Sequence, residues 1–473
     1  MSTVPKPGEP VSLKRNYLSF PETIAQSFAN ISPTLTPALS IPLVVANAGA
    51  GTWLVYLVSM VGLALVGANI AGFGKRLATP GALYHYVGAG FGPLAGFVSG
   101  WAMLAAYLGT AMATLLGVGI FANILGHLIG LSLPEPAWDL LGALMVWYVA
   151  YKDIRLSAVS ALIMEFTSVT FIVILSAIVL FSHGFHWDGA QFALSGVKPG
   201  GLALGMVLTV FSYVGFESAA TLGHESRQPF LNIPRSVLTS IAVAGLFFIL
   251  LAYVEVLGYP GGTAALSTAS APLNAIASRY HVAWFGPLTD LGAMVSLFSC
   301  TLASVNAGSR TLFAMGQDRH LSIHLGRAHQ VNQTPHVAVT IASMAVLAAT
   351  WALSQAQPLN AYGYFGTYAT YGFILAYILV SLAFPFYLRR ESRVKLRHWL
   401  IAIIAAIFMT IPLVGSIYPV PAFPYNILPY AFLVYVGAGI WLYRRNRIEL
   451  RMREEQQAAA GAESLEAMEI DAD

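Results

Sequence analysis

Three acidic residues lie inside long apolar stretches of the sequence, and their side chains are the first candidates for chemistry. Glu165, Glu217 and Asp290 each stand among aliphatic and aromatic neighbours. An acid at the centre of a membrane helix costs on the order of 3 kcal/mol, so it is usually retained for a function. A buried carboxyl whose charged form is disfavoured by desolvation can take up and release a proton, as a proton-coupled carrier requires. The simpler alternatives are a neutral cap on a broken helix for Glu217 and a polar packing contact for Asp290.

Two apolar stretches also carry residues that interrupt a helix. Pro33 and Pro37 lie among hydroxyl side chains in one stretch, and Gly215 lies beside an acid in the other. Proline removes a backbone donor and clashes with the preceding turn, and irregular backbone at membrane depth occurs only where it lines a cavity or is buried in protein. Interruptions at corresponding positions of two halves favour a transport site, although single kinks occur in membrane helices of every function. The residues at these interruptions that we expect to bind substrate are Ser32, Thr34, Leu35, Thr36, Ser212, Tyr213 and Gly215.

The elements that position these residues must be membrane helices. Of the 473 residues, 57% are hydrophobic and 10% are charged, against roughly 25% charged in an average soluble protein. This composition excludes an ordinary soluble domain and predicts an all-α polytopic membrane protein. The net charge of +3 is too small to indicate nucleic-acid binding. Residues 1–19 are polar and basic, and the apolar segment after them is too long for a signal peptide, so we expect the first helix to remain.

About 20 apolar residues span a bilayer, and the apolar runs of this sequence divide into twelve such segments. The predicted transmembrane helices cover residues 22–48, 53–74, 94–123, 138–151, 156–182, 203–222, 236–258, 284–308, 337–355, 363–387, 399–417 and 427–443. The two interrupted helices are the first and the sixth, which are the first helices of two halves of five. No Lys or Arg falls within any of these segments.

The basic residues give an independent prediction of orientation, because Lys and Arg accumulate in cytoplasmic loops. With both termini in the cytoplasm, only Lys198 and Arg279 of the 24 Lys and Arg residues lie outside. We therefore expect a multi-pass protein of the cell (inner or plasma) membrane with both termini cytoplasmic. The predicted organisation is an N-terminal tail (1–19), a first five-helix unit (20–182), a second unit (203–388), two further helices (397–444), and an acidic, Ala-rich tail (445–473) that is disordered or a frayed helix.

Two motifs resemble a known family. The segment from Leu77 to Tyr86, with Thr79-Pro80-Gly81 inside it, and the segment from Gly215 to Ala220 are similar to amino acid permeases of the amino acid-polyamine-organocation (APC) superfamily, and the likeness extends over about residues 20–445. It implies a five-plus-five inverted repeat (the LeuT-like fold) with two added helices. It also implies secondary transport of amino acids or related amines by alternating access. Family members usually carry a Gly-rich stretch at the first break. Here Ser-Pro-Thr-Leu-Thr-Pro replaces it, leaving fewer amide donors for a carboxylate.

The resemblance also implies roles for single residues. Glu217 matches a Glu implicated in proton coupling, and Phe211 matches an aromatic gate over the substrate. Met103 and Leu104 match the helix face that lines the pocket. Glu165 lies near the position where some proton-coupled relatives place a Lys, so it is either a second titrating group or the partner of a cationic substrate. The apolar lining favours a neutral or aromatic amino acid, whereas the two acids would suit an amine or polyamine.

Other ions, partners and reactions are less well supported by the sequence. Sodium is an alternative to the proton, since Ser296, Ser299, Thr301 and Ser304 offer hydroxyls on the eighth helix. The histidines show no metal spacing, and the Gly-rich run 88–92 follows no strand, so we expect no cofactor, no metal and no enzymatic activity. Cys300 is the single cysteine and lies in an apolar run, so no disulfide-linked accessory subunit is expected. A channel would need a hydrophilic pore helix; a channel and a membrane enzyme are the distant alternatives.

Overall fold

The computed structural model describes residues 13–448, apart from 195–196, 198, 270 and 419. Regular structure in this part of the chain is helical, with a single parallel bridge between Leu18 and Ser226. The helices are α1 (Phe20–Ile31), α2 (Ile41–Ala48), α3 (Thr52–Gly74), α4 (Leu83–Phe91), α5 (Pro93–Leu128), α6 (Glu135–Lys152), α7 (Ile154–Ser182), α8 (Gly189–Ala193), α9 (Pro199–Tyr213), α10 (Pro229–Gly258), α11 (Gly262–Leu266), α12 (Pro272–Arg279), α13 (Gly286–Gln317), α14 (His336–Ala352), α15 (Pro358–Arg390), α16 (Leu396–Gly415) and a last helix over 428–448.

Within the described residues, nine helical stretches are long and apolar enough to cross a membrane. One of them, Phe20–Gly74, includes both of the first two predicted crossings. The predicted helices 138–151 and 337–355 correspond to α6 and α14; α6 is not among the nine, and α14 is apolar but shorter than they are. The chain is therefore all-helical with many candidate spans, in agreement with the predicted class. Most of the predicted tail 445–473 lies outside the described residues.

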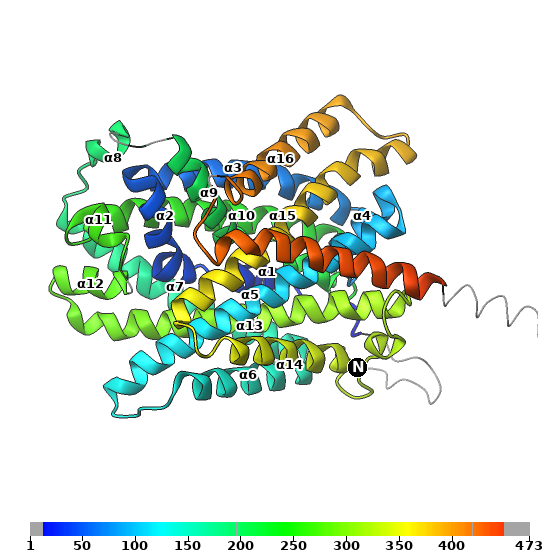
Figure 1. Cartoon of the computed structure of the whole chain (residues 1–473), viewed down its shortest axis with the longest axis horizontal. Helices are drawn as coiled ribbons and strands as arrows, with labels where there is room; N and C mark the ends of the chain where they lie inside the picture. The colour runs from blue at the N-terminus through cyan, green and yellow to red at the C-terminus, as the bar shows by residue number, and fades with distance from the viewer. Residues whose placement is uncertain (1–12, 195–196, 198, 270, 419, 449–473) are drawn as a thin grey trace, which may run out of the picture.

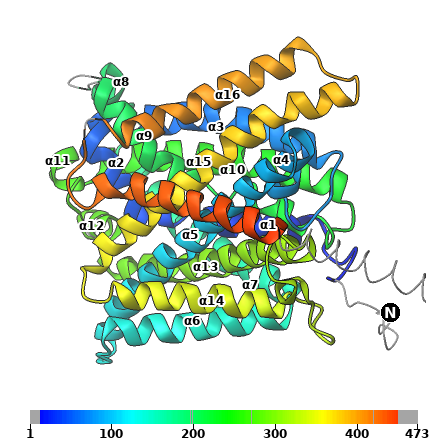
Figure 2. The same cartoon turned by 45° about the vertical axis from the view of Figure 1, so that its right-hand side comes forward.

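The long helices form one bundle whose centre is built from α5, α13 and α15. Helix α5 packs against both α13 and α15. Helices α6 and α14 lie side by side along one edge of the bundle, and α16 lies along the opposite edge (Figures 1 and 2). The short helices α8, α11 and α12 gather at one end, and α4 lies toward the other end (Figure 1). The broken α1–α2 segment is thus enclosed by longer, regular helices.

The first predicted interruption is a real break. Helix α1 ends at Ile31, and Ser32 adopts a left-handed conformation with φ of 50°. The chain resumes as a π-helical turn over Thr36–Ser40 before α2 begins at Ile41. Because Pro33 and Pro37 have no backbone N–H, neither can donate the bond that a continuous helix would need.

The second interruption is also real. Helix α9 ends at Tyr213, the chain turns over residues 214–217, and a 3-10 turn, η3, covers Ser218–Leu222. Gly215 stands in this turn with φ of 101°, a conformation that side chains with a Cβ rarely adopt. The sixth predicted helix is therefore two pieces joined at the position of the glycine.

Helix α13 is longer than predicted and carries a buried basic residue. Helix α13 continues to Gln317, beyond the predicted end at residue 308, so Arg310 lies within a membrane-length helix. Its side chain is 1% exposed and pairs with Glu225, which is equally buried. The predicted segment ended earlier because it was limited to the apolar run, whereas the helix continues past that run.

Candidate functional site

The two helix breaks lie against each other. A Cβ added to Gly215 would come within 2.8 Å of the carbonyl carbon of Asn30, so only a glycine allows this approach without a shift. The Ser27 hydroxyl donates to the carbonyl of Phe216 at 2.7 Å, and the Ser218 hydroxyl donates to the carbonyl of Gln26 at 3.1 Å. Side chains of each broken helix therefore satisfy backbone groups of the other, as the loss of internal helical bonds requires.

Glu217 is the polar centre of the second break. Tyr107 of α5 donates to its Oε1 at 2.9 Å, and Tyr377 of α15 donates to its Oε2 at 2.5 Å. The amide of Gly215 also donates to Oε2, at 3.1 Å. The carboxyl is fully buried, and it connects the unwound backbone to two long central helices. A change in its charge would alter bonds to three separate elements at once.

Glu165 is connected to the first break through a serine. The Ser296 hydroxyl of α13 donates to the Glu165 carboxylate, with distances of 3.0 and 2.8 Å to its two oxygens. The hydroxyls of Ser296 and Ser32 are 2.9 Å apart and share a hydrogen bond. A continuous buried chain therefore runs from α7 through α13 to the residue at which α1 ends. The structure thus brings the predicted residues Ser32 and Glu165 together through Ser296.

Three buried polar atoms at the first break have no hydrogen-bond partner among the described residues. They are Nδ2 of Asn30 and the hydroxyl oxygens of Thr34 and Thr36. Leaving a buried polar group unpaired costs about 1–3 kcal/mol, so such groups are rare unless a ligand or water completes them. A donor amide and two hydroxyls are groups that can bind a carboxylate or an ammonium.

Phe211 lines a small cavity beside the breaks. The cavity has a volume of about 20 Å³, and Ser40 and Tyr362 also line it. The rings of Phe211 and Tyr362 are 6.2 Å apart and nearly perpendicular. This space holds about one water molecule.

The other predicted residues are buried but have different surroundings. Ser212 and Tyr213 bond to α3, because the Ser212 and Tyr56 hydroxyls are 3.2 Å apart and the Tyr213 hydroxyl donates to the Tyr56 carbonyl at 2.9 Å. Met103 and Leu104 are buried on α5, one turn from the Tyr107 that reaches the second break. Leu35 is buried within the first break.

Asp290 has a partner outside the breaks. Its carboxylate accepts a bond of 2.6 Å from the amide of Asn274 on α12. This contact fits the packing role that the sequence offered as the alternative. Asp290 therefore serves as a matched control for the acids at the breaks.

Several residues of the site were missed by the sequence prediction. Tyr377 gave no signal, since a tyrosine in an apolar helix is usually a packing residue. Asn30, at the end of α1, was assigned no role from the sequence, yet its side chain accepts a bond from Ser304 at 2.5 Å. The carbonyl of the same Asn30 accepts a bond from the Cys300 thiol at 3.2 Å. The hydroxyls of α13 were noticed only as possible sodium ligands, although the spacing of Ser296, Cys300 and Ser304 places these three on one helix face toward a common partner.

Of the four hydroxyls considered for sodium, three have other partners, whereas the buried Ser299 hydroxyl has no hydrogen-bond partner among the described residues. Ser296 and Ser304 bond to the residues just described, and the Thr301 hydroxyl lies 2.8 Å from that of Thr114. Among the residues that the structure describes, no group of three or more His, Cys, Asp or Glu side chains could hold a metal ion.

A second buried network lies at the end of the bundle that carries Arg310. The Arg310 guanidinium donates to both oxygens of Glu225, at 2.6 and 2.9 Å. The carbonyl of Glu225 accepts bonds from the amides of Tyr17 and Leu18, at 2.7 and 2.8 Å. These bonds hold the segment before α1 against the loop that follows the second break.

Comparison with known proteins adds an independent line of information. A profile of the amino acid permease family matches residues 26–457. The chain is 22% identical over 310 residues to the branched-chain amino acid permease BcaP of Bacillus subtilis, covering 62% of this chain and 65% of that protein. It is 23% identical to the serine/threonine exchanger SteT of Bacillus subtilis (70% and 74% covered) and 25% identical to cationic amino acid transporter 4 of Mus musculus (70% and 54% covered). These proteins are transporters rather than enzymes.

Proposed function

We propose that this chain, which belongs to the amino acid permease family, is a secondary transporter that moves amino acids across a membrane by alternating access. Its family and its apolar helices make it a multi-pass membrane protein. The observation that carries the proposal is the contact between two broken helices with unpaired polar atoms at Asn30, Thr34 and Thr36. Such breaks offer bare backbone and side-chain groups to a solute near the centre of the bilayer.

The architecture that we propose has twelve crossings, built as an inverted repeat of residues 20–182 and 203–388 with two further helices in 397–444. The breaks in the first helix of each half support this division. The distribution of Lys and Arg supports a position in the cell membrane with both termini in the cytoplasm.

We propose a neutral amino acid as the substrate. Phe211 lines the small cavity beside the breaks, Leu35 is buried within the first break, and Met103 and Leu104 are buried on α5 one turn from Tyr107. The names of the relatives range from branched-chain to serine/threonine to cationic amino acid transporters, so the choice rests on the apolar side chains. An amine or polyamine is the second candidate, because Glu165 and Glu217 place two carboxyls at the breaks.

Uptake into proteoliposomes tests this assignment. The purified protein is reconstituted, and the accumulation of labelled leucine, serine, lysine and putrescine is measured with and without an inward pH gradient. We expect saturable accumulation of a neutral amino acid that the gradient increases. Accumulation of putrescine alone would select the amine carrier, and a current that does not saturate with solute would instead indicate a channel.

Glu217 is the residue that we propose couples proton binding to movement of the broken helices. A Glu217→Gln variant keeps the shape of the side chain but cannot change charge, so it should lose the effect of the pH gradient. We expect gradient-driven accumulation to fall about tenfold, since the carboxylate makes charge-assisted bonds of about 1.5 kcal/mol or more. Asp290→Asn, which changes a buried acid bonded to Asn274, is the control. Unchanged gradient-driven uptake in Glu217→Gln would remove the coupling role.

Glu165 is the second proposed coupling group. Because its carboxylate has fewer hydrogen-bond donors than that of Glu217, with Ser296 as the donor that also reaches the first break, we expect Glu165→Gln to reduce gradient-driven accumulation by a smaller factor, about fivefold, as a loss of about 1 kcal/mol predicts. The contributions of the two acids are compared by the ratio of accumulation with the pH gradient to accumulation without it, measured in each variant. If Glu165→Gln abolishes this ratio and Glu217→Gln does not, the roles are reversed. Sodium coupling predicts dependence on a sodium gradient instead.

A further inference from the structure

Glu255 is a buried acid that the transport mechanism proposed above does not use. It lies one turn before the end of α10, and its side chain is 2% exposed. Neither of its carboxyl oxygens has a hydrogen-bond partner among the described residues. None of the ion pairs formed within this part of the chain includes it. Leaving a buried polar group unpaired costs free energy, so this carboxyl calls for an explanation.

The buried acids described above differ from Glu255 in having donors. Glu217 accepts three hydrogen bonds, and Glu165 and Asp290 each accept from a neighbouring side chain. Glu225 is paired with an arginine. These acids are all buried, so burial alone does not set Glu255 apart. Its distinguishing feature is a carboxyl without any donor or cation.

The neighbours of Glu255 do not supply a charge that would stabilise a carboxylate. Helix α10 packs against α3, α7, α9, α12 and the π-helical turn Thr36–Ser40. The Arg279 guanidinium on α12 donates to the backbone carbonyls of Gly258 and Tyr259, at 3.2 and 2.8 Å, rather than to the carboxyl. The charged and titratable groups at this end of α10 and on the elements around it are Tyr56, His183, Asp188, Tyr253, Arg279 and Tyr280.

The protonation state of Glu255 follows from these surroundings. The His183 ring shares a hydrogen bond with the Tyr280 hydroxyl, and the Asp188 carboxylate accepts from Gln191, so both have partners of their own. An ionised carboxylate away from water and without a partner is far more costly than a neutral carboxyl. Glu255 therefore carries its proton in the conformation described.

One face of α10 connects Glu255 with the second helix break. Phe248 lies two turns before Glu255 on the same face, and its ring contacts those of Tyr56 and Tyr213, with centroids 5.9 and 5.2 Å apart. Tyr213 is the last residue of α9 before the break. The Tyr56 hydroxyl, which interacts electrostatically with the Glu255 carboxyl, shares a hydrogen bond of 3.2 Å with Ser212. A change of charge at Glu255 would therefore act on side chains that hold α9 at the break.

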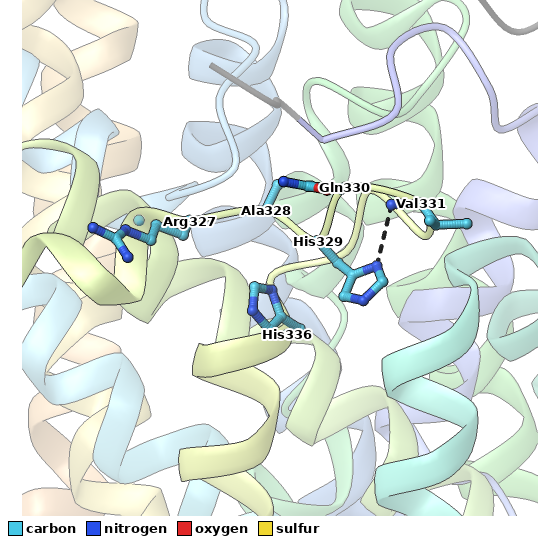
Figure 3. Close-up of a pocket in the computed structure, with 7 residues that line it drawn as sticks. Arg327, Ala328, His329, Gln330, Val331 and His336 are labelled. Carbon is cyan, nitrogen blue, oxygen red and sulfur yellow. Dashed lines mark hydrogen bonds between the residues drawn. The ribbon is translucent and has the colours of Figure 1, made fainter. Parts of the chain in front are cut away.

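Two cavities of the structure do not bring water to Glu255. A cavity of about 520 Å³ lies in the loop between α13 and α14 and is lined by residues 326–331 and His336 (Figure 3). The small cavity beside the breaks is lined by Phe211 and Tyr362 among others, and Glu255 lines neither of them. Ionisation of Glu255 therefore requires the packing around α10 to change so that water reaches the carboxyl.

We propose that Glu255 is a third proton-binding group of the carrier, neutral in the conformation described and ionised when the packing of α10 against α3 and α9 opens to water. This inference rests on the proposed function, because it adds a residue to the coupling role given to Glu217 and Glu165. Release of the proton and opening of the packing occur together, so Glu255 links the pH of the solution to the position of the helices at the second break.

Chemical labelling tests the protonation state directly. The detergent-solubilised full chain is treated at neutral pH with N,N′-dicyclohexylcarbodiimide, an apolar reagent, and the modified peptides are quantified by mass spectrometry. The carboxyl proton moves to a carbodiimide nitrogen, the carboxyl oxygen bonds to the carbodiimide carbon, and the adduct rearranges to an N-acylurea without a leaving group. We expect Glu255 to react at least about tenfold faster than Glu225, which is equally buried but ionised in its ion pair.

Transport by variants tests the coupling role. Accumulation in proteoliposomes is measured at an inward gradient of one pH unit with the membrane potential clamped at zero. One pH unit supplies about 1.4 kcal/mol for each proton carried, which is about tenfold in accumulation. We expect Glu255→Gln to lower gradient-driven accumulation about tenfold and to keep the rate of gradient-free exchange within about twofold. Glu255→Asp, which retains an ionisable group, should keep most of the gradient effect, and Asp290→Asn is the control.

The outcomes separate this inference from the proposed function. The inference is overturned if Glu255 is labelled no faster than Glu225, or if Glu255→Gln accumulates solute as the parent protein does. A parallel loss of exchange and accumulation in Glu255→Gln would assign the residue a structural role and would also overturn it. If the parent protein itself shows no saturable uptake, the proposed function fails, whereas the labelling still decides whether Glu255 holds a proton.

Discussion

An Arg310→Met variant should be less stable than the parent protein by about 3–5 kcal/mol, the cost of breaking a buried ion pair from one side. The guanidinium and the Glu225 carboxylate are each 1% exposed, and they are joined by bonds of 2.6 and 2.9 Å. Without Arg310, the carboxylate remains in the interior with no compensating charge. Unfolding of the detergent-solubilised protein, followed by tryptophan fluorescence, measures the loss.

Two further variants show whether the loss comes from the unpaired charge. Arg310→Met combined with Glu225→Gln should recover most of the stability, because replacing both partners of a buried pair is often nearly neutral. Arg393→Gln, which removes an exposed arginine, should change little. If Arg310→Met is no less stable than Arg393→Gln, the buried pair contributes nothing to the fold.

Gly215→Ala should reduce transport at least about tenfold while leaving the helices outside the breaks intact. The added Cβ would lie 2.8 Å from the backbone of Asn30, and the residue would keep a φ of 101°. Strain of about 1–3 kcal/mol is expected from the backbone conformation alone, and separating the two breaks would add to it. Initial rates of uptake in proteoliposomes measure the effect, and circular dichroism checks the helical content.

Substitutions at two other glycines show whether the loss of transport comes from the contact between the breaks or from the strained backbone conformation. Gly92 has a φ of 99° and no atom within 4 Å of an added Cβ, so Gly92→Ala carries the backbone strain without the contact. Gly205 lies in α9, where an added Cβ meets Val44 at an ordinary 3.4 Å. We expect Gly92→Ala and Gly205→Ala to transport better than Gly215→Ala. Equal rates in Gly215→Ala and Gly92→Ala would show that contact between the breaks is not needed.

The properties that the sequence predicts well are local ones. Pro33, Pro37 and Gly215 interrupt helices because of their own covalent structure, so both breaks could be placed from the chain alone. The apolar runs predicted the helical class for the same reason, since a helix of about 20 apolar residues spans the bilayer. The motif resemblance predicted the family that the profile match shows.

The pairing of residues across the bundle could be decided only by the tertiary structure. Tyr377 reaches Glu217 across 160 positions of sequence, and Ser296 joins Glu165 to Ser32 across 131 and 264 positions. The sequence did not indicate that Arg310 is buried, because its partner Glu225 comes from another element of the bundle. A residue's hydropathy is a property of its own side chain, whereas the free energy of a buried charge depends on which distant partner the packed helices bring to it.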